Sequence, residues 1–584
     1  MGKILKKLNV LLDKRQKKIM VFLVFVMLIG AALELLGVGL IYQAAGVITD
    51  PDILENNDLL AGIYEGLHMS SMTQFSMLIM AALIAVFAVK NGYLFFQNKL
   101  QFQFVYSNQF ATSRRMMINF MQRPYEYYLN ADTSVIQRSI TSDVNNMYGL
   151  ILSLLQLVSE IIVFICLTVY CLTTDVVMTG TVAVLLIAVL VIIKCILKPI
   201  MRKAGEENQD YYSGLYKWIE QSVMGIKEIK IGCKENYFIN EYAKCGAGYV
   251  NSVQKYNLFN ATPRLLIETV CIAGMVGYFV LSIGQGTQLK ELLPQLSALA
   301  AAAMRLLPCV NRINNYQTSI SYFEPFFMGV SDNLQEEIHD GNVTYDAEAY
   351  KQRQSVEKLP LEKLIRLEDI TYKYPNTETL IFNHADMEIP IGSSVGIVGV
   401  TGAGKTTIVD ILLGLLQMES GRILADGTDV SGHYAAWLKN IGYIPQTIFM
   451  IDDSIRKNVA FGVPEEEIDD EKVWRALQEA ALDDFVKSLP DGMETGIGER
   501  GIRISGGQRQ RISIARALYE DPEVLVLDEA TSALDNETEA AIMDSINRLH
   551  GRKTLVIIAH RLQTIEKCDV VYRVEDGKIS ATNM

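Results

Sequence analysis

The fold of the C-terminal half of the chain is decided by the stretch Gly399-Val400-Thr401-Gly402-Ala403-Gly404-Lys405-Thr406-Thr407. It matches the G-x-x-x-x-G-K-[ST] pattern of a phosphate-binding loop without a gap. The apolar run 395–398 precedes the loop as a short buried strand, and 408–413 follows it with the pattern of a helix. The glycines therefore lie at a strand-to-helix turn, which is where this kind of loop holds phosphate.

Each part of this loop has a role in binding a nucleotide. Glycines let successive backbone N–H groups converge on phosphate oxygens, and the helix N-terminus adds a partial positive charge. Lys405 supplies a full positive charge, and the hydroxyl of Thr406 is a ligand for Mg²⁺. We therefore predict that residues 399–407 bind ATP and that Mg²⁺ is the second cofactor.

Hydropathy divides the 584 residues into two parts. The chain is 50% hydrophobic, which is more than an ordinary soluble protein contains. The excess lies before about residue 325, in runs of about 20 residues that are long enough to cross a membrane. We predict an α-helical six-span transmembrane domain followed by an α/β P-loop nucleotide-binding domain. The predicted boundaries are 1–329 for the transmembrane domain, 330–360 for a linker and 361–584 for the nucleotide-binding domain.

The predicted spans occupy 19–48, 75–96, 149–173, 176–200, 263–285 and 292–323. The segments 97–148 and 198–262 are rich in Lys and Arg, whereas the loop 49–72 contains neither. Both chain ends should therefore face the cytoplasm, which places the protein in the cytoplasmic (inner) membrane. The two basic segments are predicted to extend the spans as long helices and to reverse direction at 123–130 and at 209–217.

Two short amphipathic segments flank the first span. Residues 3–14 place Ile4, Leu8 and Leu11 at helical spacing among lysines, which predicts a helix on the inner membrane surface. A signal peptide is the competing interpretation, but the apolar run that follows is too long for one. Residues 59–67 of the outer loop predict a helix on the outer leaflet or on the spans, with a solvated loop as the alternative.

Charge and cysteine content argue against two kinds of function. The net charge is −13, and the chain has no dense basic tract, so we expect no nucleic acid as a partner. The eight cysteines show no C-x-x-C spacing and fall mostly in apolar runs. This pattern favours reduced structural thiols over metal ligands or disulfides.

Two adjacent carboxylates, Asp528 and Glu529, follow the apolar strand 524–527. Such a position puts them at the edge of a sheet, beside the phosphates. Asp528 is predicted to hold Mg²⁺ directly or through water. Glu529 is predicted to accept a proton from the attacking water.

The stretch Ile504-Ser505-Gly506-Gly507-Gln508-Arg509-Gln510-Arg511 closely resembles the signature motif of ATP-binding-cassette proteins. It departs from the motif only at Ile504, where leucine is usual. Ser505 is expected to cap a helix, and the two glycines expose backbone N–H groups, so the domain has a second phosphate site. Two phosphate sites are explained if two domains pair head to tail. Each ATP then lies between the Lys405 loop of one domain and the Ser505 loop of the other.

The resemblance implies further site residues. It implies that Tyr374 stacks on adenine, that Gln446 senses Mg²⁺ and the membrane domain, and that Asp535 makes contacts in trans. His560 follows the strand 554–559 and is implied to be the switch histidine, which binds the γ-phosphate and orients Glu529. Besides the loop 399–407, the candidate residues are Tyr374, Gln446, Ser505, Gly506, Gly507, Gln508 and Asp535 for the nucleotide, Glu529 and His560 for catalysis, and Thr406, Gln446 and Asp528 for the metal.

Six spans followed by one cassette resemble the half-transporters of the exporter type. This resemblance covers nearly the whole chain. Because all ATP-site residues are present, we expect a homodimer with a second copy of the chain. The reversals at 123–130 and 209–217 resemble coupling helices, which would dock on the cassettes and transmit their closure to the spans.

Charged residues inside predicted spans are costly and therefore indicate function. Arg305 and Arg312 are two helical turns apart and share one face of the sixth span. With Arg264 at the start of the fifth span, they are predicted to bind an anionic head group, because guanidinium is a good ligand for diphosphate. Interhelical ion pairs with Glu34 or Glu160 are the alternative.

The run 292–313, the amphipathic outer loop and the intact cassette resemble bacterial flippases that move polyprenyl-diphosphate-linked oligosaccharides. The resemblance implies ATP-driven movement of a lipid-linked anionic substrate from the inner to the outer leaflet of the membrane. An exporter of drugs, peptides or another lipid remains open. A nucleotide-gated channel is a further alternative, against which the intact Glu529 and His560 argue.

Overall fold

The structure is a computed structural model. It describes residues 2–49, 71–174, 176–284, 289–339, 356–375, 377–528, 542–544, 546–559 and 565–582, with Gly62, Tyr64 and Gly66. Contacts divide the chain into two compact units. Residues 1–123 and 131–344 form the first, which we call the helical unit. Residues 124–130 and 345–584 form the second, which we call the α/β unit.

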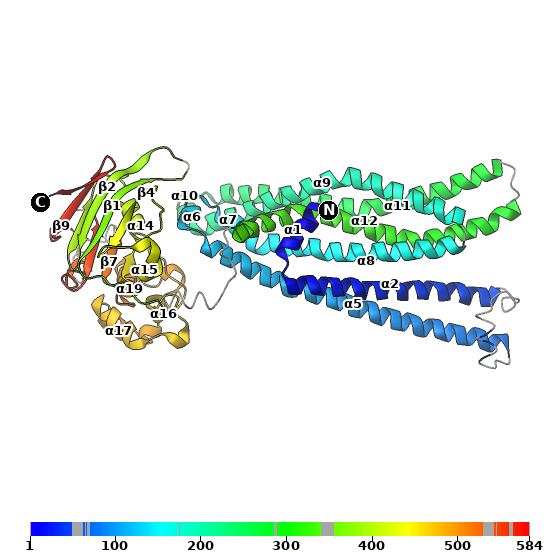
Figure 1. Cartoon of the computed structure of the whole chain (residues 1–584), viewed down its shortest axis with the longest axis horizontal. Helices are drawn as coiled ribbons and strands as arrows, with labels where there is room; N and C mark the ends of the chain where they lie inside the picture. Colours follow the sequence, from blue (N-terminus) through cyan, green and yellow to red (C-terminus); the bar gives the residue numbers. More distant parts are fainter. Residues whose placement is uncertain are drawn as a thin grey trace. The chain divides into compact units, whose positions relative to one another are not determined.

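The helical unit is built from long helices (Figure 1). Its elements are α1 (Gly2–Leu11), α2 (Lys14–Thr49), α5 (Met72–Gln122), α7 (Thr133–Arg138), a π-helical turn (Ser139–Asp143), α8 (Val144–Thr174), α9 (Val176–Met224), α10 (Ile226–Gly232), α11 (Glu235–Gly284) and α12 (Leu289–His339). Helices α2, α5, α8, α9, α11 and α12 each contain one predicted span. Helices α5, α9 and α11 continue far beyond the apolar runs, as the composition of the basic segments predicted.

The helical unit is long and apolar enough to be embedded in a membrane. Within the residues that the structure describes, Lys14–Gly37, Met72–Gln122 and Thr133–Tyr170 each have the length and hydropathy of a membrane span. The chain is therefore an integral membrane protein. The six spans and the cytoplasmic position of both ends stay predictions.

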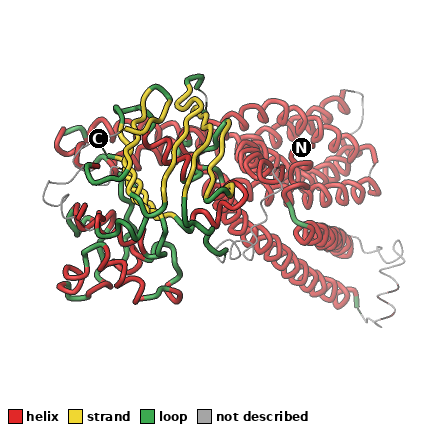
Figure 2. The backbone as a smooth tube through the Cα atoms, turned by 60° about the vertical axis from the view of Figure 1, so that its left-hand side comes forward, coloured by secondary structure: helices red, strands yellow, loops and turns green. Residues whose placement is uncertain are grey.

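The long helices form two groups. Helix α2 lies beside α5, whereas α12 packs on both α8 and α9, and α11 packs on α9 and α12 (Figures 1 and 2). Tyr256 of α11 stacks on Tyr322 of α12 with ring centroids 4.2 Å apart. Gly205 of α9 comes so close to this point that a Cβ atom there would lie 2.1 Å from the carbonyl oxygen of Tyr322. The absence of a side chain at Gly205 thus allows the close packing of α9 on α12.

The first reversal lies where it was predicted, and the second does not. Helix α5 ends before Pro124, and the short helix α6 (Tyr125–Asn130) follows. The predicted reversal at 209–217 is wrong, because α9 runs without a break to Met224 and the chain turns over 225–234, around α10. Gly214 packs against α11 instead of forming a turn: a Cβ atom there would lie 2.7 Å from Cys245 Sγ.

Helix α1 buries its apolar face against protein. Ile4, Leu8 and Leu11 are buried, and α1 packs on α12, where Lys7 forms an ion pair with Asp332. The expectation that this face lies on the membrane surface is therefore wrong for the structure described. Amphipathic spacing predicts that one face is covered, but it does not distinguish lipid from another helix.

The predicted outer-loop helix at 59–67 lies outside the described residues, apart from Gly62, Tyr64 and Gly66. The ring of Tyr64 packs edge-on against Phe75 of α5 at a centroid distance of 5.2 Å. The linker predicted for 330–360 begins later than expected, because α12 continues to His339. Residues 340–355 lie outside the described part of the chain.

The α/β unit contains two sheets, visible as yellow strands in Figure 2. The strands are β1 (Leu364–Lys373), β2 (Leu380–Pro390), β3 (Ser394–Val398), β4 (Ser420–Ala425), β5 (Thr428–Asp429), β6 (Ile441–Ile444), β7 (Val524–Asp528), β8 (Thr554–Ile558), β9 (Val570–Glu575) and β10 (Lys578–Thr582). The helices are α6, α14 (Lys405–Leu412), α15 (Tyr434–Leu438), α16 (Ile455–Val459), α17 (Asp470–Glu479), α18 (Asp483–Ser488) and α19 (Gly506–Leu518). Together with the helical unit, this confirms the predicted fold class.

The order of the larger sheet positions the candidate site. Its strand order is β10-β9-β3-β8-β7-β6, and all neighbours except β10 pair in parallel. Every residue of β7 and β8 is buried, which explains their continuous apolar runs. Because the strands are parallel, the carboxyl ends of β3, β8, β7 and β6 meet at one edge, and the segments that follow them build one site. The smaller sheet, β2-β1-β4-β5, is antiparallel.

Candidate nucleotide site

The phosphate loop has the backbone that its glycines predict. It connects β3 to α14, with φ of 84° at Gly402 and 103° at Gly404. Side chains disfavour this left-handed region, whereas glycine adopts it freely. A Cβ atom at Gly404 would also lie 2.9 Å from Ile381 of β2. The glycines are therefore needed both for the turn and for the close approach of β2.

Lys405 is held inside the loop that it follows. Its side chain is buried, and its Nζ donates hydrogen bonds to the carbonyl oxygens of Gly399 at 3.0 Å and Val400 at 3.3 Å. These carbonyls fix the ammonium group at the N-terminus of α14, where the helix dipole also favours an anion. The following residue, Thr406, is exposed, so a metal ion can reach its hydroxyl.

Tyr374 lies beside the first turn of α14. Its hydroxyl is 2.9 Å from Oγ1 of the buried Thr407, and its ring packs edge-on against Tyr372. The structure thus brings Tyr374 to the phosphate loop, as predicted. Stacking on adenine stays a prediction.

Negative charge gathers at the same sheet edge. Asp528, the last residue of β7, is buried, and the hydroxyl of Tyr443 of β6 donates to its Oδ2 at 3.3 Å. Burial, and then the nearby Asp528, raise the pKa of Asp410 in α14 to about 6. Two nearby carboxylates repel each other when both are ionised, and a divalent cation between or beside them relieves that repulsion. The donor set of Thr406 and Asp528 therefore fits Mg²⁺, although the metal itself stays a prediction.

The other residues predicted for catalysis and metal binding come after strands whose carboxyl ends lie at this edge of the sheet. Gln446 is exposed just after β6, which pairs with β7. Glu529 directly follows β7, and β8, which lies between β3 and β7, ends two residues before His560. Glu529, Asp535 and His560 themselves lie outside the described residues, so their roles stay predictions.

The signature segment forms a second helix N-terminus. Ser505 is the N-cap of α19: its Oγ accepts from the backbone N–H of Gln508 at 3.2 Å, and its own N–H donates to Gln508 Oε1 at 2.8 Å. The predicted cap is therefore present. The Gln508 side chain is used in this reciprocal box, a role that the S-x-x-Q spacing could have indicated. Ser505 and Gly506 are exposed, so an anion can reach this N-terminus.

The helices that begin at the two predicted phosphate sites, α14 and α19, pack into different hydrophobic cores. Helix α14 buries Ile408 and Leu412 in a core with β1, β2 and β4. Helix α19 buries Ile512 and Ala515 in a second core, to which α16 and α17 also contribute. The two predicted phosphate sites thus begin helices that pack into different cores, both of which include residues of β7 and β8.

Helix α6 belongs to the α/β unit, although both of its neighbours in sequence belong to the helical unit. Glu126 Oε1 accepts a hydrogen bond from the backbone N–H of Gln417 at 2.8 Å. Partial desolvation and the nearby Asp410 raise the pKa of Tyr125. The reversal predicted as a coupling helix therefore packs beside the helix that follows the phosphate loop. Asp410 was not among the predicted site residues, and its signal in the sequence is a single charge among the apolar residues 408–413.

One of the three predicted substrate arginines, Arg312, forms an ion pair with a glutamate of another helix. Arg312 Nε lies 2.7 Å from Oε1 of Glu160 in α8. Arg264 is exposed on α11, and the side chain of Arg305 lies outside the described residues. Within the described residues, no hydrogen bond or ion pair connects Arg264 with Arg312. The ion-pair alternative is realised for Arg312, and the role of all three in substrate binding stays a prediction.

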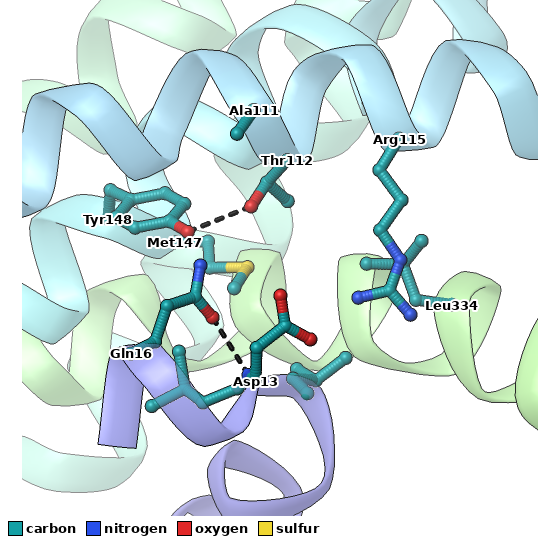
Figure 3. Close-up of a pocket in the computed structure, with 10 residues that line it drawn as sticks. Asp13, Gln16, Ala111, Thr112, Arg115, Met147, Tyr148 and Leu334 are labelled. Carbon is teal, nitrogen blue, oxygen red and sulfur yellow. Dashed lines mark hydrogen bonds between the residues drawn. The ribbon is translucent and has the colours of Figure 1, made fainter. Parts of the chain in front are cut away.

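A small cavity of about 130 Å³ lies where α1 meets α2 (Figure 3). Asp13, Gln16, Thr112, Arg115 and Tyr148 are among its lining residues. The Thr112 and Tyr148 hydroxyls are 2.8 Å apart, and Gln16 Oε1 accepts from the backbone N–H of Asp13. Ligand pockets for small molecules are usually about 300–1,000 Å³, so this cavity is too small for a lipid.

Fold and site together define a membrane protein with a P-loop nucleotide-binding domain. Comparison with known families matches residues 19–285 to the ABC transporter transmembrane region and residues 382–532 to the ABC transporter family. The chain belongs to the ABC transporters, and it has both their membrane and their ATP-binding domains. The family predicted from the phosphate loop and the signature motif is thus confirmed.

Relatives of this chain carry different names. An ATP-dependent lipid A-core flippase of Cupriavidus metallidurans is 40% identical over 227 residues, which are 38% of each chain. The heterocyst differentiation ATP-binding protein HepA of Nostoc is 32% identical over 364 residues, covering 61% of this chain and 56% of HepA. The putative multidrug export ATP-binding/permease protein YgaD of Bacillus subtilis is 27% identical, covering 65% and 64%.

The solved structures give the fold over nearly the whole chain. A bacterial Atm1-family ABC exporter with ATP bound superposes with a TM-score of 0.74 at 20% identity, covering 97% of this chain and 95% of that one. This likeness establishes a half-transporter fold. The named relatives above are each matched over less than two thirds of their own length, so their substrates do not transfer to this chain directly.

Proposed function

We propose that this chain is one half of an ABC exporter that hydrolyses ATP to move an amphipathic lipid across the cytoplasmic membrane. The observation that carries the proposal is the phosphate loop with its buried Lys405, joined in one chain to a unit of membrane-length helices. The homologues named lipid A-core flippase support lipid movement as the task.

The residues of the nucleotide site divide the work of hydrolysis. Lys405 and the N-terminus of α14 would hold the phosphates, and Thr406, Gln446 and Asp528 would hold Mg²⁺. Bound MgATP supplies the phosphoryl group that is transferred to water. Glu529 accepts a proton from that water, and His560 orients it. Glu529 directly follows the buried strand β7, and the buried strand β8 ends two residues before His560, so we expect both at the sheet edge of the phosphate loop.

The assembly that we propose is a homodimer. Ser505 begins a helix that stands on a different core from the phosphate loop, so each domain offers two anion sites. A head-to-tail pair uses both, with each ATP between Lys405 of one copy and Ser505 of the other. Helix α6, which packs beside α14, would transmit domain closure to the helical unit.

For the cargo, we propose a polyprenyl-diphosphate-linked oligosaccharide that moves from the inner to the outer leaflet. Arg312 lies in the sixth predicted span, on the face that also carries Arg305, and guanidinium binds diphosphate through bidentate hydrogen bonds. A second candidate, export of a neutral or cationic drug-like amphipath, is favoured by the ion pair of Arg312 with Glu160, which neutralises the arginine.

A reconstituted system separates these two candidates. The purified chain in liposomes is assayed for ATP hydrolysis and for lipid movement with lipid-linked sugar diphosphates, monophosphates, neutral lipids and cationic drugs. We expect the diphosphates to stimulate hydrolysis and to be moved. If cationic drugs stimulate ATP hydrolysis and no diphosphate does, the second candidate is correct instead.

A further inference from the structure

The ion pair between α8 and α12 is geometrically incomplete. Arg312 Nε approaches Glu160 Oε1 to 2.7 Å, whereas the buried Glu160 Oε2 lacks a hydrogen-bond partner in the described part of the chain. The remaining recorded contact of the guanidinium is from Nη2 to Cys309 Sγ at 3.5 Å. A thiol is a weak acceptor, and guanidinium has five N–H donors. Arg312 therefore retains donors that a better anion would use.

The two partners differ in how they can be reached. The Arg312 side chain is 41% exposed, whereas that of Glu160 is 17% exposed. A ligand can thus approach the guanidinium without first passing the carboxylate. Glu34 of α2 is near enough to act electrostatically on both groups, so a second carboxylate lies in the neighbourhood of this ion pair. An anion that enters must therefore compete with Glu160 for Arg312.

A membrane makes such competition necessary. Phospholipids with one negative charge are present in large excess around any span, and an unpaired arginine there would bind their phosphates. A carboxylate held at 2.7 Å has a far higher effective concentration than any single lipid. It displaces weak anions but yields to a ligand that offers more charge and more acceptor oxygens, such as a diphosphate.

We propose that Glu160 is a specificity-determining residue: it is the internal competitor that keeps singly charged phospholipids off Arg312 and admits a diphosphate. This inference rests on the proposed anionic cargo. During transport the diphosphate replaces the carboxylate on the guanidinium, so Arg312 keeps a counter-ion while Glu160 loses its own. Leaving a buried carboxylate unpaired is costly, and a weakly bound anion does not offset that cost.

The test uses the full chain and its Glu160→Gln variant in phosphatidylcholine liposomes, with farnesyl diphosphate as the probe. In the variant, the probe concentration that half-stimulates ATP hydrolysis should fall by about tenfold, the scale of one close charge pair. Phosphatidylglycerol added to the liposomes should weaken the response of the variant and leave that of the unmodified chain intact. Probe binding to the detergent-purified proteins, measured by calorimetry, should show the same shift.

Glu268→Gln is the matched control, because Glu268 is a carboxylate of a predicted span that is exposed on α11 and forms no ion pair within the described residues. This variant should show the same half-stimulating probe concentration and the same response to phosphatidylglycerol as the unmodified chain. The double variant Glu160→Gln/Arg312→Gln guards against misfolding: it should fold but lose the response to the probe. If the double variant instead keeps the response, Arg312 is not the binding group.

Two failures have different meanings. If farnesyl diphosphate stimulates and binds the unmodified chain and Glu160→Gln equally, the competitor role is wrong while the anionic cargo stands. If neither protein binds any anionic probe, and a cationic amphipath stimulates the unmodified chain but not the variant, the proposed cargo is wrong and this inference falls with it.

Discussion

The nucleotide site and Arg312 of α12 differ in where the partner of their positive charge comes from. The ammonium group of Lys405 is held by two carbonyl oxygens of its own loop, five and six residues away in sequence. Arg312 is balanced by a carboxylate from a different helix, α8. The first arrangement is local and can be recognised from a motif. The second depends on how helices pack, and it becomes visible only in three dimensions.

The difference also has a functional side. A local arrangement keeps its geometry when domains move, because the loop carries its own hydrogen-bond acceptors. An ion pair between two helices changes when either helix shifts or when a competing anion arrives. We therefore expect changes in the first region to act on hydrolysis and changes in the second to act on cargo.

The largest expected effect is at Glu529. Glu529→Gln keeps the shape of the side chain but cannot take a proton, so turnover should fall by about a hundredfold or more while ATP binding persists. Hydrolysis and nucleotide binding by the purified protein measure this directly. Turnover within about threefold of the unmodified protein, at matched nucleotide occupancy, would falsify the role of Glu529 as the base.

Mixed dimers test whether Lys405 and Ser505 of opposite chains share one ATP. With Lys405→Ala and Ser505→Arg on the same chain and an unmodified partner, each ATP site carries one lesion, so neither stays whole. With one change on each chain, both lesions fall in one site and the other remains intact. Nucleotide occupancy should therefore be higher in the second dimer. The reverse order would show that the head-to-tail arrangement is wrong.

A smaller and more selective effect is expected at the arginines of the sixth helix. Arg305→Ala should weaken movement of a lipid diphosphate by about tenfold or more, given roughly 1.5–3 kcal/mol for a hydrogen bond to a charged group. Arg305→Lys should restore it in part, because lysine offers only a point charge. The double variant with Arg312→Ala should be the most severe, with basal hydrolysis retained. If a folded double variant moves the lipid diphosphate at an unchanged rate, the arginines do not bind the cargo and export of a drug-like amphipath becomes the better-supported function.

The smallest effect concerns pH. The pKa of Asp410 is raised to about 6 in the folded chain, above its usual value of 3.8. The folded state therefore binds this proton more tightly than the unfolded state, so its contribution to stability is present at low pH and is lost as pH rises from about 4 to about 6. Asp410→Asn should flatten this part of the pH profile of thermal unfolding and raise the midpoint at pH 7. An unchanged profile would show that Asp410 is well solvated.

Much of the α/β unit was predictable because its signals are local. The phosphate loop, the cap at Ser505 and the buried strand before Asp528 each follow from residues that are neighbours in sequence. Asp410 was missed because a single carboxylate in a helix becomes unusual only when β7 is placed beside it. No local pattern carries that information.

The helical unit was predictable in its helices and less so in their contacts. Hydropathy located the long helices, but the second reversal was placed at 209–217, inside α9, where Gly214 allows close packing on α11. The partner of Arg312 was left open between Glu34 and Glu160 for the same reason. Pairings between distant helices depend on register and rotation, which composition does not specify.

The packing of α1 on α12 constrains the order of events during synthesis. Helix α1 leaves the ribosome before α2 to α12, yet α12, on which Ile4, Leu8 and Leu11 are buried, is made after all the other helices described in this unit. Throughout translation of the intervening helices, this apolar face needs a temporary cover, and the lysines beside it suit the anionic surface of the inner leaflet. Docking of α1, with Lys7 on Asp332, thus marks the completion of the membrane part of the chain.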